Sequence, residues 1–359
     1  LAAIDRLANT PLADTSDSDG AGTRVVYISP LRALAVDVER NLRAPINGVA
    51  HQAERLGVSV RIPSVGVRSG DTDQAERRRL QRHPPDILIT TPESLYLMLT
   101  SSVSRTLANV DTVIIDEIHS LAPTKRGAHL AMSIERLVEL CGRDVQRIGL
   151  SATQRPLSET AAFLGGFDDA GSARPVEVVD LGSARTIDVR VSVPIEDMAD
   201  PSTSPAAASG DPEARRSIWP SLVPEILTEI LAHRSTIVFC NARRSAERLA
   251  ARLNAAAADA GVGVDPVTGE VTHDIVRAHH GSIARQQRLE IEDRLKRGEL
   301  RAIVATSSLE LGIDMGAVDR VIQVESPGSV ARGLQRIGRA GHSVDRTSAG
   351  TVYPKHRGD

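Results

Sequence analysis

The stretch Val113-Ile114-Ile115-Asp116-Glu117-Ile118-His119 places two carboxylates directly after a run of apolar residues. A short run rich in Val and Ile is typical of a strand that is buried on both faces of a parallel sheet. Ligands of such sheets bind beyond the carboxyl ends of the strands, which is where Asp116 and Glu117 fall. An isolated Asp-Glu pair is more often a solvated turn, but its position after a buried strand favours a chemical site.

Similar apolar runs recur along the chain, separated by helical patterns. They are residues 24–28, 86–90, 110–115, 147–150, 236–240, 275–278, 301–305, 320–324 and 350–353. This recurrence predicts an α/β protein with two tandem domains, each a mostly parallel sheet flanked by helices. We expect the first domain at residues 1–193 and the second at residues 221–359. Residues 194–220, rich in Pro, Ser and Ala, are interpreted as a linker or an insertion, and residues 255–269 as a surface loop.

The composition is that of a globular protein, with 359 residues of which 41% are hydrophobic and 25% charged. No apolar run approaches the roughly 18 residues of a membrane-spanning helix, so we expect a cytoplasmic protein without membrane contact. The net charge of -3 means that any nucleic-acid binding must be local rather than a property of the whole chain. Cys141 and Cys240 lie alone in apolar contexts, which indicates buried thiols rather than a disulfide or a metal site.

The polar residues that follow the apolar runs suit phosphoryl transfer. In ATP hydrolysis a carboxylate such as Asp116 can hold Mg²⁺, often through water, while a second one such as Glu117 orients and deprotonates the attacking water. The run at 147–150 is followed by Ser151-Ala152-Thr153, whose hydroxyls can bond the neighbouring acidic loop. For these residues alone, a helix cap is the simpler interpretation.

A third polar stretch, Gln335-Arg336-Ile337-Gly338-Arg339-Ala340-Gly341-His342, places Arg336 and Arg339 three residues apart. If the stretch is helical, both side chains lie on the same face. Two arginines so placed can clamp a phosphate, and guanidinium groups of this kind contribute about 10³ to 10⁵ in the rate of phosphoryl transfer. A solvated arginine face is the alternative when the stretch is considered alone.

Taken in this order, the three stretches resemble motifs of the superfamily-two helicases. Residues 116–119 resemble motif II of the DExH group, residues 151–153 resemble motif III, and residues 335–339 resemble motif VI. Further stretches fill the gaps between them: residues 29–35 resemble motif Ia, residues 90–95 motif Ib, residues 237–243 motif IV and residues 305–316 motif V. The combination is far more specific than any of its parts.

Within this superfamily the chain is most similar to the large helicase-related (Lhr) group. The similarity spans nearly the whole chain. It is most evident in four sequence stretches: Ser29-Pro30-Leu31-Arg32-Ala33-Leu34, Arg68-Ser69-Gly70-Asp71-Thr72, His279-His280-Gly281-Ser282 and residues 353–359. The resemblance implies two RecA-like domains, ATP bound between them, and one nucleic-acid strand crossing both. Members of the group are typically single-strand-dependent ATPases that move 3′ to 5′ and unwind DNA duplexes or RNA:DNA hybrids.

The resemblance also implies roles for individual residues. Catalysis falls to Asp116, Glu117, His119, Gln335, Arg336 and Arg339, with His119 coupling the ATP site to motif VI and Asp116 holding Mg²⁺. Cofactor binding falls to Ser151, Thr153, Gly312 and Asp314. Nucleic-acid binding falls to Pro30, Arg32, Thr91, Pro92, Glu93, Asn241, Arg243, His280, Thr306 and Ser307. Loop hydroxyls, amides and a few arginines suit a grip on the phosphate backbone, and aromatic residues at only 2% leave little room for base stacking.

One expected part is missing from the sequence, because it contains no G-x-x-x-x-G-K-[ST] phosphate-binding loop. A site that lacks this loop should bind ATP poorly. In the family the loop is followed by a helix and then by the strand before motif Ia, and residues 1–8 have helical spacing before the strand at 24–28. We therefore expect motif I just upstream of Leu1, and winged-helix and further domains after Asp359.

Three hypotheses for function follow from the sequence. The first is an ATP-driven helicase or translocase that uses ATP and Mg²⁺ and binds single-stranded nucleic acid, with DNA favoured and an RNA:DNA hybrid as the other candidate. The second is an ATP-independent nucleic-acid-binding module. The third is a nucleic-acid-stimulated ATPase that remodels protein complexes without unwinding.

Overall fold

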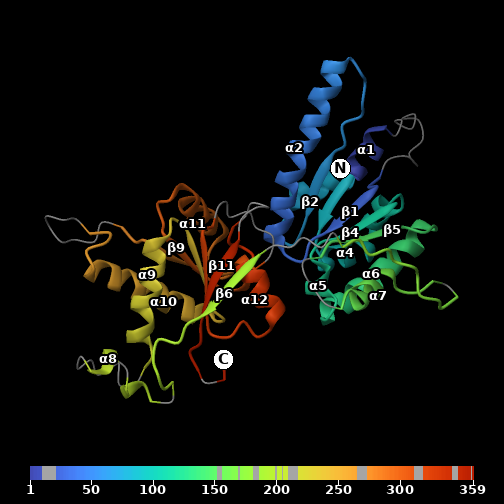
Figure 1. Ribbon diagram of the computed structural model, residues 1–359. Coiled ribbons are helices and arrows are strands. Elements are labelled where there is room, and N and C mark those ends of the chain that lie inside the picture. Colours follow the sequence, from blue (N-terminus) through green and yellow to red (C-terminus); the bar gives the residue numbers. More distant parts are fainter. Residues whose placement is uncertain are drawn as a thin grey trace. The chain divides into compact units, whose positions relative to one another are not determined.

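The computed structural model describes residues 1–9, 22–151, 156–168, 170–180, 186–198, 200–203, 205–208, 217–264, 273–310, 318–341, 347–356 and 358–359. The chain divides into two compact units, Leu1–Asp180 and Leu181–Asp359 (Figure 1). The first unit ends earlier than residue 193, where the sequence had placed the end of the first domain. The reason is a strand at Ile187–Val191, which pairs with the sheet of the second unit.

The first unit contains a five-stranded parallel sheet in the order β2-β3-β1-β4-β5. Its elements are α1 (Ala2–Asn9), β1 (Val25–Ile28), α2 (Arg32–Leu56), β2 (Val65–Arg68), α3 (Gln74–Arg82), β3 (Ile87–Thr90), α4 (Pro92–Leu99), η1 (Ser102–Leu107), β4 (Thr112–Ile115), α5 (Ile118–Leu121), α6 (Lys125–Cys141), β5 (Gln146–Gly149) and α7 (Leu157–Gly165). Because all strands are parallel, their carboxyl ends meet at one edge of the sheet.

Helices cover both faces of this sheet, and each strand therefore needs apolar side chains on both sides. On one face Leu95 of α4, Leu130 of α6 and Leu164 of α7 pack into a common cluster with alternate residues of the strands. On the other face Ile4 of α1 and Ile46 of α2 pack against the remaining strand residues. This arrangement explains why the central strands β1, β3 and β4 were recognisable as continuous apolar runs.

The second unit contains a six-stranded parallel sheet in the order β6-β11-β10-β7-β9-β8. Its elements are β6 (Ile187–Val191), η2 (Pro201–Thr203), α8 (Pro205–Ala208), α9 (Trp219–Ala232), β7 (Thr236–Phe239), α10 (Arg243–Asp259), β8 (Val276–His279), α11 (Arg285–Arg297), β9 (Ala302–Ala305), η3 (Ser307–Leu309), β10 (Arg320–Val324), α12 (Val330–Ile337) and β11 (Ser348–Tyr353). The expected fold, two parallel sheets flanked by helices, is confirmed.

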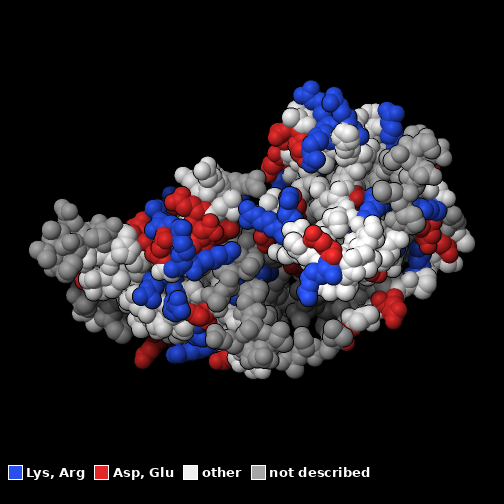
Figure 2. All heavy atoms as spheres, turned by 90° about the horizontal axis from the view of Figure 1, so that it is seen from above, with Lys and Arg blue, Asp and Glu red and all other residues white. Residues whose placement is uncertain are grey.

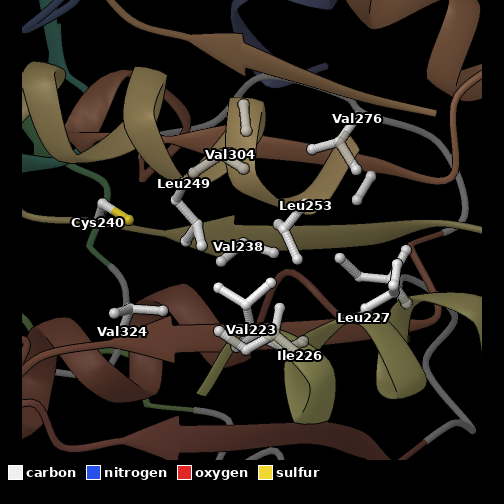
Figure 3. Packing of buried hydrophobic residues seen from close by; sticks show 14 of the residues in the cluster. Val223, Ile226, Leu227, Val238, Cys240, Leu249, Leu253, Val276, Val304 and Val324 are labelled. Carbon is white, nitrogen blue, oxygen red and sulfur yellow. The ribbon is translucent and has the colours of Figure 1, made fainter. Parts of the chain in front are cut away.

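The main core of the second unit lies between its sheet and helices α9 and α10. Figure 3 shows Val238 of β7 surrounded by side chains of both helices, among them Ile226 and Leu253. Cys240 belongs to the same cluster, and burial raises the pKa of its thiol to about 12. Cys141 is also a free thiol but only half-buried, so the prediction of a buried thiol is confirmed for Cys240 and wrong for Cys141.

One predicted loop differs from the structure, and the predicted linker or insertion contains short helical segments. Helix α10 continues to Asp259, although residues 255–269 were interpreted as a loop, because alanine is the best helix former and Ala257 is buried in the core. The segment 194–220 contains η2, α8 and the beginning of α9. None of the described helices is both long and apolar enough to cross a membrane.

Candidate functional site

The acidic loop after β4 lies at the carboxyl edge of the first sheet. The backbone N–H of Asp116 donates to the carbonyl of Ile28 at 2.9 Å, so the loop continues the pairing of β4 with β1. Glu117 follows with φ 46° and ψ 42°, a left-handed conformation that is rare for residues other than glycine. Its N–H donates to Asp116 Oδ1 at 2.9 Å. The loop thus turns sharply and presents two adjacent carboxylates.

Burial sets the electrostatics of Asp116. It raises the pKa of this carboxyl, and a hydrogen bond donated by the Tyr27 hydroxyl opposes the rise in part. The register pairs Tyr27 with Ile114, so Tyr27 and Asp116 lie on the same face of the sheet. Burial and the Asp116 carboxylate in turn raise the pKa of Tyr27 far above its ordinary value. Tyr27 therefore holds the Asp116 carboxylate in place.

His119 connects the acidic loop to the end of β5. Its Nε2 lies 3.5 Å from Glu117 Oε2, and its Nδ1 lies 3.2 Å from the hydroxyl of Ser151. Burial lowers the pKa of His119, with a smaller opposing effect of Asp116, so the imidazole is neutral at neutral pH. Ser151 thus contacts the acidic loop, as its hydroxyl suggested from the sequence, while its partner Thr153 lies outside the described residues.

The donor set of this loop fits Mg²⁺ better than a transition metal. Among the described residues there is no group of three or more His, Cys, Asp and Glu side chains that could hold a metal ion by themselves. Mg²⁺ is commonly held by one or two carboxylates together with water and substrate phosphates. Asp116 is such a carboxylate, and its neighbour Glu117 remains available for another task.

The predicted nucleic-acid residues of the first unit lie at the amino ends of helices α2 and α4. Arg126 of α6 joins these two helix ends, because its guanidinium donates to Glu93 at 2.6 and 3.1 Å and to the carbonyl of Pro30 at 3.0 Å. Burial tends to raise the pKa of Glu93, but the bonds from Arg126 outweigh it and the pKa is lowered. Pro92 occupies the first turn of α4 and is buried, and Thr91 is buried with its hydroxyl on Ser94.

Arg32 begins α2 and remains exposed. Its guanidinium lies 2.5 Å from Asp71, which belongs to the loop after β2. It also rests on Gly70, where an added Cβ would lie 2.6 Å from Arg32 Nη2 and would push the flexible Arg32 side chain aside. Because both members of the Arg32–Asp71 pair are more than half exposed, the pair can open to admit a phosphate at little cost.

The second unit gathers its motif residues around one buried arginine. Arg336 of α12 is 2% exposed, and all three nitrogens of its guanidinium donate hydrogen bonds. Nε donates to Glu310 at 2.8 Å, and Nη2 donates to the same carboxylate. Nη1 donates to Gln323 at 2.6 Å and to Asn241 at 3.3 Å. The guanidinium carbon also lies 5.1 Å from the ring centroid of Phe239.

The condition on which Arg336 and Arg339 were expected to share one face, a continuous helix, is not met. Helix α12 ends at Ile337, so the two arginines do not share a helical face. Arg336 is enclosed by partners of its own unit, whereas Arg339 is half-buried and donates from Nη2 to the carbonyl of Glu310 at 2.8 Å. The geometry makes Arg336 an anchor and leaves Arg339 as the candidate for phosphate contact.

The Arg336–Glu310 pair is expected to dominate the stability of the second unit. Replacing Arg336 with Met leaves the Glu310 carboxylate, which is 9% exposed, without its main partner, and breaking a buried pair in this way costs about 3–5 kcal/mol. Denaturant unfolding of the chain measures the loss. Arg332→Met, on the same helix and 3.9 Å from Glu310, is the control, and its exposed side chain should contribute less than about 1 kcal/mol. Equal small losses for both variants would contradict the anchor role.

The remaining candidates of the second unit lie at neighbouring strand ends. Asn241 follows β7 and donates to the carbonyl of Ser326 at 2.8 Å, and exposed Arg243 donates to the hydroxyl of Ser282 at 2.7 Å. His280 follows β8 and is buried with its Nε2 2.7 Å from Glu247. The structure brings these three residues to the same edge of the sheet.

Thr306 and Ser307 follow β9 at the same edge. Thr306 is buried and its N–H donates to the carbonyl of His279, while Ser307 is exposed at the start of η3. Gln335 has a buried Nε2 that finds no hydrogen-bond partner within the described part of the chain. Gly312 and Asp314 lie outside the described residues.

Comparison with known families decides the assignment. Residues 1–160 match the model of the DEAD/DEAH box helicase family, and residues 221–343 match that of the helicase conserved C-terminal domain. The chain belongs to the superfamily-two helicases. Each unit of this Lhr-like helicase chain corresponds to one of the two models, and its two parallel sheets are the RecA-like domains of that superfamily.

Curated relatives carry the Lhr name. The chain is 50% identical to the Lhr helicase/uracil glycosylase of Escherichia coli, a match that covers 100% of this chain and 24% of the relative. It is 41% identical to the ATP-dependent helicase Lhr-Core protein 2 of Thermococcus barophilus, over 93% of this chain and 36% of the relative. The chain therefore spans about a quarter to a third of the length of these relatives.

A solved structure supports the same grouping. The helicase Lhr of Mycobacterium smegmatis bound to ssDNA and AMP-PNP superposes with a TM-score of 0.82 and 52% identity, over 99% of this chain and 42% of that one. The DEAD-box helicase Mss116 bound to ssRNA and UDP-BeF has a TM-score of 0.68, and at 19% identity it supports the fold alone. The expected Lhr-like, superfamily-two grouping is confirmed.

Proposed function

We propose that the native protein carrying this chain is an ATP-dependent helicase or translocase that hydrolyses ATP when single-stranded nucleic acid binds. The observation that carries the proposal is the acidic loop of the first unit. It presents Asp116 and Glu117 side by side at the carboxyl edge of a parallel sheet, with His119 bridging Glu117 to Ser151. Membership of the superfamily-two helicases supports the same conclusion.

Each residue of the loop has a distinct role in this proposal. Asp116 would hold Mg²⁺, which neutralises charge on the phosphates of ATP when it is bound. Glu117 orients the attacking water and accepts its proton on a carboxylate oxygen. Neutral His119 holds the Glu117 carboxylate in place and links it to the hydroxyl of Ser151. Arg339 supplies positive charge to the transferring phosphoryl group, and the anchored Arg336 holds the segment that carries it. Gly312, Asp314 and Thr153 stay cofactor candidates from the sequence.

The grip on nucleic acid is proposed to be independent of base sequence. Exposed Arg32 and Arg243 offer charge, and Ser307 offers a hydroxyl at the same kind of strand end, all suited to phosphate oxygens. Buried Thr91, Thr306 and His280 shape the loops that carry these contacts. Single-stranded DNA is the favoured partner, because an Lhr relative is known bound to ssDNA. Movement 3′ to 5′ on DNA or on an RNA:DNA hybrid is proposed from the resemblance to the Lhr group.

The deciding experiment uses the native protein. ATP hydrolysis is measured with and without single-stranded DNA and RNA, and strand displacement is measured on duplexes with a 3′ or a 5′ overhang. We expect hydrolysis to depend on the single strand and displacement to need the 3′ overhang. Strand binding without hydrolysis would instead support an ATP-independent binding module. Hydrolysis without displacement would support an ATPase that remodels nucleoprotein complexes.

A further inference from the structure

The first unit has a hollow that none of the helicase motifs touches. Its volume is about 530 Å³, and it is lined by Arg78, Gln81, Arg82, Ser102, Arg105 and Thr106. Three of these residues come from α3 and three from η1, two short helical segments that are separated in the sequence by β3 and α4. The hollow therefore depends on the fold rather than on a single loop.

The hollow lies at the opposite edge of the sheet from the motifs. Helix α3 ends shortly before β3 begins and η1 ends shortly before β4 begins, so both reach the amino ends of the strands. The carbonyl of Thr106 accepts the N–H of Thr23, which precedes β1 at the same edge. The acidic loop follows the carboxyl end of β4. Strands of four residues separate the two edges by about 13 Å.

No acidic side chain of the described residues compensates the charge in this hollow. Among the residues that line it, Arg78, Arg82 and Arg105 are cationic and none is acidic. Within the described part of the chain none of these arginines forms an ion pair; Arg78 and Arg105 each donate from Nε only to a backbone carbonyl of their own segment. Three guanidinium groups thus share one hollow in a chain whose net charge is -3.

Other arginines near this edge form ion pairs with acidic side chains. Arg24 is paired with Asp111 at 2.8 Å, and Arg61 is paired with Asp86. On α3 itself Arg79 is paired with Glu76 at 2.7 Å. On the face seen in Figure 2, basic and acidic side chains are likewise interspersed over much of the described surface. The hollow is an exception to this pattern.

Leaving the hollow uncompensated has an energetic cost. Arg78 and Arg82 are four residues apart on α3, and like charges at this spacing destabilise a helix by about 0.2–0.5 kcal/mol. Arg105 adds a third positive charge from η1. A bound anion would turn this repulsion into attraction, and charge-assisted hydrogen bonds from arginine to phosphate are among the strongest in proteins.

We propose that this hollow is a second binding site for the phosphate backbone of a nucleic-acid strand, separate from the strand track at the carboxyl edge. The inference rests on the proposed function only in taking a nucleic acid as the partner. The arginines supply charge and paired donors, and Ser102 and Gln81 add neutral donors to phosphate oxygens, while the hydroxyl of Thr106 already donates to the carbonyl of Val103. None of the lining residues is aromatic, so the site holds a backbone without base stacking.

The test is the salt dependence of strand binding by the native protein. The triple variant Arg78→Gln, Arg82→Gln, Arg105→Gln is compared with the wild type by fluorescence anisotropy, using labelled single-stranded DNA and a labelled duplex at several salt concentrations. Each phosphate contact adds about 0.7 to 0.9 to the slope of log affinity against log salt concentration. We expect the slope to shrink by about 2 to 3 in the triple variant with at least one of the two ligands.

A matched control removes the same charge elsewhere on the first unit. Arg40, Arg43 and Arg55 are exposed on α2 and do not line the hollow, and their triple replacement with Gln should leave the slope nearly unchanged. An equal change in both triple variants, or no change in either, overturns the proposal. If inorganic phosphate at low millimolar concentration abolishes the difference between wild type and variant, the hollow binds free phosphate and the proposal for a strand is also overturned.

The two proposals fail in distinguishable ways. The triple variant should retain its rate of ATP hydrolysis at saturating single strand, because its substitutions lie at the opposite edge of the sheet from Glu117. Absence of hydrolysis in the wild type would contradict the proposed function, but the salt dependence of strand binding could still be measured. A normal slope in the triple variant with normal hydrolysis would contradict only the second site.

Discussion

The Glu117→Gln variant of the native protein is expected to hydrolyse ATP about 10² to 10⁴ times more slowly than the wild type, because general-base catalysis contributes a factor of this size. The amide keeps the shape of the carboxylate and can still orient a water, but it cannot accept the proton. ATP affinity should change little, because Glu117 acts on the water rather than on the nucleotide. Steady-state hydrolysis at saturating single strand, together with equilibrium binding of a non-hydrolysable ATP analogue, measures both quantities.

The control for this variant is Glu54→Gln. Glu54 lies on α2 with its side chain 84% exposed, so the same change of charge and shape is made away from the acidic loop. It should leave turnover within error of the wild type. Unchanged turnover in Glu117→Gln would remove Glu117 from the role of base. A parallel loss of nucleotide affinity would mean that the residue supports binding instead of chemistry.

Arg339→Ala is expected to lower hydrolysis by about 10³ to 10⁵ without loss of strand binding, the range found when an arginine that meets a transferring phosphoryl group is removed. The structure gives the reason for choosing Arg339 over Arg336. Arg339 is half-buried, whereas Arg336 is 2% exposed and its guanidinium donates to Glu310, Gln323 and Asn241. Anisotropy with labelled single-stranded DNA measures binding beside the hydrolysis assay.

Two further variants sharpen this prediction. Arg339→Lys keeps the charge but loses the planar pair of donors, so we expect an intermediate rate. Arg332→Ala removes an exposed arginine of α12 and should leave hydrolysis unchanged. Intact hydrolysis in Arg339→Ala would take the residue out of the catalytic role, and a drop in strand binding would reassign it to the nucleic-acid grip.

Most of the fold could be predicted from the sequence because most strands are buried on both faces. The strands that were missed, β2 and β6, lie at the edges of their sheets. The sequence of β2 carries Gly66, and in β6 Ile187, Val189 and Val191 alternate with polar residues, so neither reads as an apolar run. The pairing of β6 with β11 joins segments far apart in the chain, and local patterns carry no record of such a contact.

The candidate site, like the fold, could be predicted only in part from the sequence. Spacing located Asp116, Glu117 and Ser151 at one edge, because strand ends of a parallel sheet coincide. Spacing could not separate Arg336 from Arg339, since the difference arises from tertiary contacts with Glu310. Tyr27 was missed for a related reason: it reads as an ordinary strand residue until the register places its hydroxyl on Asp116.

The left-handed backbone of Glu117 bears on attempts to make a more heat-resistant variant. Only two described residues other than glycine adopt positive φ, Glu117 and Glu325. A routine engineering strategy would replace both with glycine, which adopts this conformation without steric strain. At Glu325 the exchange gives up one contact, with Lys355. At Glu117 it would relieve the strain of the left-handed backbone but remove the carboxylate that we propose as the proton acceptor. Thermostability design in this protein should therefore begin elsewhere.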